Sequence, residues 1–362
     1  MGWPGDSTRF GPPRLPPAKM VQVAEESKNE LPELIPVHPE GKIFRNKVAI
    51  PIGCKPHPAF DIPVAPQTPT YLARVPRGRV LGPTVAVLTS GDRMLSDVSL
   101  DWGRPGAEHY AYRRFRVPRC KDYQGSALVL ACTGSDTYYH WLTDALPRLE
   151  IAARAHGDKW SPDFWVVNTL SQAFVRESLA LLNIPLDRVI ALDKTPHVRF
   201  SEVWIPSLPC EASSGDTPSW VVSFLQKAFL PCLGKVRPPY LPKRIWIDRS
   251  STKSRRLVLT NEIRHKLKQL RYTALRLETL AIADQVGLFH GAEAIAGPHG
   301  AGFCGITFSS KANMIEFFES DYINPCYYSL GQHTNSNYYY NISKSNLEES
   351  ISVDLTNFLK DL

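Results

Sequence analysis

The stretch Glu293-Ala-Ile-Ala-Gly-Pro-His-Gly-Ala-Gly302 is a short apolar run that ends in a glycine-rich turn with a histidine at its tip. Gly297, Gly300 and Gly302 give the turn backbone freedom and let a ligand approach the main chain closely. If the turn opens a helix, its free N–H groups and the positive end of the helix dipole face one point, and His299 adds a donor. The pattern is typical of a phosphate-binding turn. A plain αβ turn whose glycines only allow close packing would carry the same glycines.

Apolar strand patterns and helical patterns alternate on both sides of this turn. The expected strands of this part are 127–131, 164–168, 188–192, 244–248, 272–277, 293–296 and 313–317. Apolar residues at helical spacing separate the strands, and we expect Thr260 to cap one of these helices. Such alternation is typical of parallel sheets covered by helices, which bind ligands at the carboxyl ends of their strands. The glycine turn lies at such an end.

The chain length predicts more than one domain. A single core rarely extends over the 362 residues present here. We expect a proline-rich arm at 1–45, an N-terminal domain at 46–236 and a C-terminal domain at 237–362. The second boundary falls at a proline-rich join, 237–242. Within the N-terminal domain, proline-rich sequence up to about residue 120 predicts an irregular β-rich layer, with strands at 47–50 and 84–88.

Composition excludes several classes of protein. Hydrophobic residues make up 43% of the chain and charged residues 21%, as in globular proteins. No apolar run is long enough to span a bilayer and no signal core is visible, so we expect a cytoplasmic protein. The seven cysteines show no C-x-x-C pair, which argues against a zinc site or disulfide framework. The net charge of +7 suits an anionic ligand and is compatible with a peripheral membrane association. The basic residues are dispersed along the chain, which argues against nucleic-acid binding.

The segment 138–149 carries residues suited to acid-base chemistry. On a regular helix, His140, Asp144 and Arg148 are spaced by four and share one face. A histidine and a carboxylate on one face can act as a general base or hold a sugar, and they can equally brace the helix. Pro147 lacks a backbone donor and should kink the helix or begin a new one.

A basic loop follows the expected strand 244–248. It contains Arg249 and Arg256, whose planar guanidinium groups match phosphate oxygens. A solvated loop without a ligand is the alternative interpretation. Glu316, at the end of the strand after the glycine turn, is a candidate for accepting hydrogen bonds from ribose hydroxyls, or a strand-end charge that faces water.

Taken in order, these motifs resemble glycosyltransferase family 61. The matching pieces are 140–144 with 147–149, 247–249 with 255–256 and 261–262, 277–280 with 285, 297–302, and 315–317. The resemblance implies a GT-B architecture, with two Rossmann-like domains facing across a cleft, and an inverting sugar transfer from a nucleotide sugar. Because no secretory anchor is visible, the branch that builds bacterial capsular and surface polysaccharides is favoured. The family usually has Asn where Gly305 stands, which puts a nucleotide or helix-capping contact in doubt.

An inverting hexosyl- or pentosyltransferase needs a base for the acceptor hydroxyl and positive groups for the leaving diphosphate. Asp144 is the preferred base, with His140 as its partner or substitute. The expected acceptor is a glycan or a lipid-linked saccharide. A lipid-linked acceptor would bring the protein to the inner face of the membrane. The expected nucleotide-sugar ligands are Arg249, Arg256, His299, Gly300, Ala301, Gly302 and Glu316. No Asp-x-Asp triplet is present, so we expect neither a metal nor a cofactor. An inactive sugar-nucleotide binder and a hydrolase using His140 and Asp144 are the alternatives.

Overall fold

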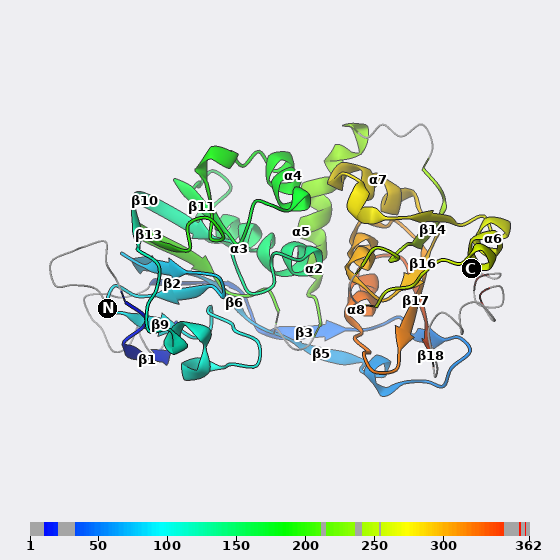
Figure 1. Cartoon of the computed structure of the whole chain (residues 1–362), viewed down its shortest axis with the longest axis horizontal. Coiled ribbons are helices and arrows are strands. Elements are labelled where there is room, and N and C mark those ends of the chain that lie inside the picture. Colours follow the sequence, from blue (N-terminus) through cyan, green and yellow to red (C-terminus); the bar gives the residue numbers. More distant parts are fainter. Residues whose placement is uncertain are drawn as a thin grey trace. The chain divides into compact units, whose positions relative to one another are not determined.

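The computed structural model describes residues 11–20, 33–210, 215–235, 241–252 and 255–343, together with Leu355 and Leu359. The chain divides into two compact units, each with its own sheet (Figure 1). Unit 1 comprises Met1–Gly41 and Thr68–Pro209, and unit 2 comprises Lys42–Gln67 and Cys210–Leu362. The expected mixed α/β structure with parallel sheets is confirmed.

Unit 1 is built on one large mixed sheet. Its strands in the described residues are β1 (Leu15–Ala18), β2 (Glu33–His38), β6 (Thr70–Pro76), β7 (Arg79–Leu81), β8 (Ala86–Leu88), β9 (Arg93–Leu95), β10 (Lys121–Val129), β11 (Phe164–Val167), β12 (Val189–Ala191) and β13 (His197–Pro206). Strands β13, β10, β11 and β12 are adjacent and parallel, while β6 and β7 join β13 antiparallel. Its α-helices are α2 (Tyr138–His140), α3 (Arg148–His156) and α4 (Ala173–Leu181).

The buried core of unit 1 explains this arrangement. The parallel strands β10 and β11 end in apolar residues, and Val129 and Val166 are fully buried in the core. Helix α3 packs on β6, β2 and β13, and Figure 1 shows α3 and α4 beside this sheet. The described part of the proline-rich arm forms β1, β2 and the start of a separate pair, β3 (Gly41–Phe44); prolines are tolerated in β1 and β2 because β1 ends the sheet and β2, in the described part of the chain, pairs with β6 alone. Residues 1–10 and 21–32 of that arm lie outside the described residues.

Unit 2 is built on a parallel sheet in the order β15-β14-β16-β17-β18-β4. Its strands are β4 (Ala49–Pro51), β14 (Arg244–Ile247), β15 (Thr273–Leu275), β16 (Ala294–Pro298), β17 (Asn313–Glu319) and β18 (Asn337–Ser343). Its α-helices in the described residues are α5 (Ser219–Phe229), α6 (Asn261–Gln269), α7 (Ile282–Gly291) and α8 (Cys326–Gln332). Strands β3 (Gly41–Phe44) and β5 (Val64–Gln67) form a separate pair. Thr260 caps α6 as expected, because its side chain accepts the Ile263 N–H at 3.2 Å.

The observed units differ from the predicted domain boundaries at both ends of the N-terminal domain. Residues 42–67 belong to unit 2, because β4 extends the sheet beside β18 and Phe60 stacks on Tyr340 with ring centroids 4.0 Å apart. Arg45 also forms a buried ion pair with Asp216. Helix α5 joins unit 2 as well, since its apolar face is buried and Phe229 packs against Phe308. These long-range contacts place the second boundary between Pro209 and Cys210, before the proline-rich join at 237–242.

Candidate functional site

The predicted site residues lie in two groups, one in each unit. His140 and Asp144 belong to unit 1, and the glycine turn with its arginines belongs to unit 2. Each group is built by the local fold of its own unit, so each is described by itself.

His140 and Asp144 form a hydrogen-bonded pair. Nδ1 of His140 lies 2.6 Å from Oδ2 of Asp144, and the hydroxyl of Thr143 donates to Oδ1 at 3.1 Å. Since an ionised carboxylate can only accept, Nδ1 of His140 is the donor in this bond, and in the neutral form of the ring the lone pair is on Nε2. Both side chains are partly exposed, at 24% for His140 and 14% for Asp144. An imidazole oriented in this way can take a proton from a hydroxyl.

A π-helical turn places this pair. The expected helix is divided into α2, the π turn η4 (Trp141–Ala145) and α3, and α3 begins immediately after Pro147 as expected. In the π turn the Leu146 N–H bonds to the carbonyl of Trp141, five residues back. Such turns insert an extra residue into the helical period and are frequent at functional sites.

The same turn corrects the expectation for Arg148. Because the regular period is broken, Arg148 does not continue the face of His140 and Asp144 but is fully buried. Its Nη1 donates to the carbonyls of Ala131 at 2.8 Å and Val129 at 3.3 Å, so the guanidinium lies at the carboxyl end of β10. Burial lowers its pKa, and the negative charge of nearby Asp144 partly restores it. Arg148 is therefore a buried support of the site.

Trp102 joins the pair from a distant loop. Its ring centroid lies 4.8 Å from that of His140, and 48% of the residue is exposed. Gly134 makes room for it: at a φ of +81°, an added Cβ would lie 2.3 Å from Cη2 of Trp102 and 2.9 Å from Cδ2 of His140. Trp102 was not among the predicted site residues, since nothing in the sequence connects the loop after β9 to residue 140.

The glycine turn leaves the carboxyl end of β16, which lies between β14 and β17. It opens the 3₁₀ helix η8 (Ala301–Phe308), where Phe303 makes the first return bond, to the carbonyl of Gly300. The N–H groups of Ala301 and Gly302 precede that bond and have no partner within the helix. The turn therefore leaves two backbone N–H groups without a helical partner at the strand end.

Arg249 lies directly against this turn. A Cβ on Gly300 would lie 1.9 Å from Nη1 and 2.4 Å from Cζ of Arg249, so a larger residue there would displace the guanidinium from its observed position. Arg249 follows β14, and its Nε donates to the carbonyl of Arg255 at 3.3 Å. Burial and then the positive charge of Arg255 lower the pKa of Arg249. A bound anion would relieve this repulsion between the two cations.

Arg255, rather than Arg256, is the second arginine of this site. Its guanidinium lies over the ring of Tyr322, 4.8 Å from the centroid, whereas Arg256 is exposed. Tyr322 also lies near His299, with ring centroids 5.4 Å apart, and keeps 47% of its surface exposed. Arg255 and Tyr322 were not among the predicted ligands, because in the loop sequence neighbouring arginines look alike.

Glu316 is part of a buried network around His299. Its Oε1 accepts a hydrogen bond from Nδ1 of His299, and its Oε2 accepts one from the hydroxyl of Tyr338 at 2.5 Å. The residue is fully buried, so a ribose could reach it only after side chains moved. Glu316 is thus placed to orient the ring of His299, which is itself buried. Burial, and then the charge of Glu316, raise the pKa of Tyr338 far above its ordinary value, so Tyr338 stays a donor.

Gly305 has a packing reason in this chain. A Cβ at this position would lie 2.2 Å from Cδ2 and Cε2 of Phe289 on α7. The asparagine usual in the resembled family would therefore require Phe289 to move. The difference from the resembled family at Gly305 therefore concerns the packing of η8 against α7 rather than the glycine turn.

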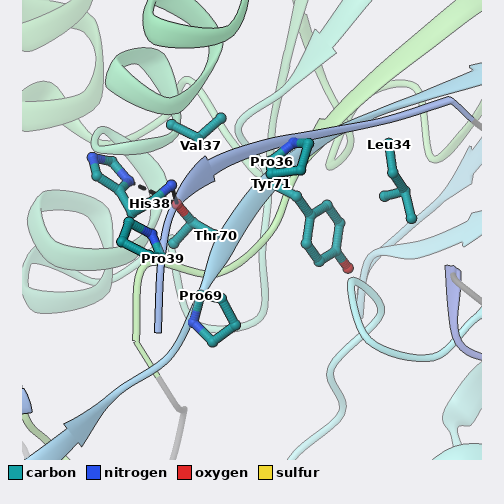
Figure 2. Close-up of a pocket in the computed structure, with 8 residues that line it drawn as sticks. All are labelled: Leu34, Pro36, Val37, His38, Pro39, Pro69, Thr70 and Tyr71. Carbon is teal, nitrogen blue, oxygen red and sulfur yellow. Dashed lines mark hydrogen bonds between the residues drawn. The ribbon is translucent and has the colours of Figure 1, made fainter. Parts of the chain in front are cut away.

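A separate pocket lies in unit 1, between β2 and the start of β6, with a volume of about 410 Å³. Figure 2 shows its prolines and Tyr71, with His38 bonded through Nδ1 to the Thr70 hydroxyl at 2.7 Å. Its walls are Leu34, Pro36, Val37, His38, Pro39, Pro69, Thr70 and Tyr71. None of the predicted catalytic or ligand-binding residues lines it. Within the described ranges, no cluster of His, Cys, Asp or Glu suited to a metal is found, and no helix is long and apolar enough to cross a bilayer.

Residues 138–315 match the family model described as Glycosyltransferase 61. The match begins at the helix that carries His140 and Asp144, and it includes Arg249 and the glycine turn. It supports the resemblance noted in the sequence and points to glycosyltransferase activity, which implies a sugar donor and an acceptor. No curated protein matches the chain.

Proposed function

We propose that the protein is an inverting glycosyltransferase that moves a hexosyl or pentosyl group from a nucleotide sugar to a hydroxyl of a glycan or lipid-linked saccharide. The observation that carries the proposal is the guanidinium of Arg249 packed on Gly300, with Arg255 beside it. Two adjacent cations and the free N–H groups of Ala301 and Gly302 suit a diphosphate. The diphosphate is the leaving group of a nucleotide-sugar donor.

In this proposal the donor site stabilises charge on the leaving diphosphate. Arg249 and Arg255 make charge-assisted hydrogen bonds, and His299 donates from Nε2 when it is protonated. Glu316 accepts the hydrogen bond from Nδ1 of His299 and fixes the orientation of the ring. Arg256 remains a candidate for an outer contact, as its side chain is exposed. No metal ion is required in this scheme.

Unit 1 supplies the acceptor side. His140 takes the proton of the acceptor hydroxyl through Nε2, while Asp144 holds the ring and stabilises the imidazolium that forms. This assignment moves the base from Asp144, our preference from the sequence, to its partner. Trp102 offers a flat apolar face on which a sugar ring can pack. We further propose a GT-B arrangement, in which the two units face across a cleft, and a cytoplasmic location.

The test is a calorimetric screen of nucleoside diphosphates and nucleotide sugars against the intact protein. We expect one nucleoside diphosphate to bind in the micromolar range, with an affinity that falls as salt is added because the contacts are charged. The best donor is then offered to a panel of saccharide acceptors, and the anomeric configuration of the product is determined by NMR. Inversion supports the proposal. Donor binding with hydrolysis only would favour an inactive binder, and no nucleotide binding would refute the donor site.

A further inference from the structure

The segment 102–121 of unit 1 carries a local excess of positive charge. It contains six arginines and lysines and one acidic residue, Glu108, while the whole chain carries a net charge of +7. The proposed transfer reaction uses none of these cations. Their purpose must therefore be sought in the surface that they form.

Phe115 lies at the centre of this basic segment, and 95% of it is exposed. The exposed arginines Arg113, Arg116 and Arg119 flank it. Among the described residues, no hydrogen bond or ion pair is found for Arg113 or Arg116. The phenyl ring of Phe115 stays in contact with water, although its removal from water would be favourable, and the exposed guanidinium groups of Arg113 and Arg116 are accessible to an anionic surface.

The residues on both sides of the 113–116 tip are firmly held. The Tyr110 N–H donates to Oδ2 of Asp101 at 2.9 Å, and the Tyr112 hydroxyl donates to the Leu15 carbonyl at 2.8 Å. Ala111 is buried in the core beneath β7 and β8, and Val117 packs against the same cluster. The tip therefore projects from an anchored base, and Phe115 is held in its exposed position.

We propose that the 113–116 tip docks the protein on an anionic lipid bilayer. Arginines near such a surface are attracted by its negative potential, and an aromatic ring inserts at the level of the headgroups. Cations together with an apolar anchor give the two signals that stable peripheral binding needs. The tip is too small for a protein partner, since a stable interface covers about 800 Å² on each side. A single ring also lacks the series of stacking aromatics typical of nucleic-acid binding.

The test is sedimentation of the full-length chain with vesicles of phosphatidylcholine alone, or with roughly one third phosphatidylglycerol. We expect binding only to the anionic vesicles. Phe115→Ala should weaken it about tenfold, because a large apolar side chain no longer inserts. Arg113→Gln with Arg116→Gln should weaken it about tenfold to thirtyfold, by the loss of two cations near the surface.

Matched controls separate this surface from charge and exposure in general. Phe44→Ala removes another exposed phenylalanine, and Arg188→Gln with Lys227→Gln removes the same charge elsewhere. These variants should bind like the wild type, and all variants should keep the wild-type melting temperature because the altered side chains are exposed. Absence of wild-type binding to anionic vesicles would overturn the proposal, as would equal losses in the controls. If Phe115→Ala did not change vesicle binding and a short oligonucleotide displaced the protein completely, the partner would be a soluble polyanion instead.

Discussion

The glycine turn of unit 2 and the His140 pair of unit 1 are positioned by different means. The turn continues a central parallel strand, and its support is buried: Glu316 fixes His299, and Gly300 lies beneath Arg249. The His140 pair lies on a π-helical turn and is covered on one side by Trp102, a half-exposed residue. The glycine turn, our proposed donor site, is thus held by the strand end and a buried network, whereas the His140 pair, our proposed acceptor site, combines a local helix distortion with a surface loop.

The largest expected effect is on turnover, and it should distinguish the His140 pair from the glycine turn. His140→Gln should lower turnover by about 10² to 10⁴ because the proposed base is lost, while nucleotide affinity stays at the wild-type value. Asp144→Asn should also lower turnover, by at least roughly a hundredfold, because an amide no longer fixes the ring tautomer and its charge. Single-turnover kinetics and calorimetry measure these two quantities.

The control for this pair is His265→Gln, which removes an exposed histidine from α6 in unit 2. It should leave turnover unchanged. If Asp144→Asn abolished transfer while His140→Gln kept it, Asp144 would be the base. A fall in melting temperature by several degrees with normal turnover per folded molecule would show that the pair only braces the helix.

Arg249→Ala should produce the next largest effect, this time on donor binding. Loss of a charge-assisted contact should weaken nucleoside diphosphate affinity by about 1.5 to 3 kcal/mol, roughly tenfold to a hundredfold. Arg256→Ala is the matched comparison, and because Arg256 is exposed its effect should be smaller. Equal losses in both variants would contradict the geometry, and unchanged affinity in Arg249→Ala with the fold intact would remove Arg249 from the donor site.

Trp102→Ala should have a smaller effect, confined to the acceptor. Loss of one stacking face should raise the KM for the saccharide about threefold to tenfold, whereas the Kd for the nucleotide does not change. Trp102→Phe should recover much of the loss because it retains an aromatic face. Saturation kinetics with varied acceptor, together with donor calorimetry, measure both constants. A change in donor affinity alone would assign Trp102 to another role.

The smallest expected effect is that of metal removal. Transfer should persist in EDTA, because arginines and backbone N–H groups are proposed to stabilise the diphosphate. Initial rates with EDTA, and with added magnesium or manganese, test this expectation. Complete loss in EDTA with recovery on adding either metal would require a metal in the donor site.

Much of the fold could be predicted because the relevant signals are local. The apolar runs around residues 127, 245 and 295 became β10, β14 and β16, and Thr260 caps α6 as expected. Strand β13 was missed because His197, Arg199 and Glu202 interrupt its apolar pattern. It nevertheless lies beside β10, where its neighbours rather than its own composition hold it in the sheet.

The glycine turn was easier to recognise in the sequence than the surroundings of His140, because its residues are contiguous. Gly300 and His299 belong to one contiguous turn whose backbone requirements are visible in the sequence. The role of Glu316 was less accessible, since ribose recognition and support of His299 both suit a carboxylate at a strand end. Only burial of the side chain favours the second interpretation.

By itself, the sequence determined the alternating strands and helices, the glycine turn, the break at Pro147 and the spacing of His140 and Asp144, because each depends on residues a few positions apart. Tertiary structure alone decided that residues 42–67 join the C-terminal sheet, that Arg148 turns inward, and that Trp102 meets His140. These features depend on which distant segments can bury their apolar surface and satisfy their polar groups together. That choice is made by the packing of the whole unit, and no short stretch of sequence contains it.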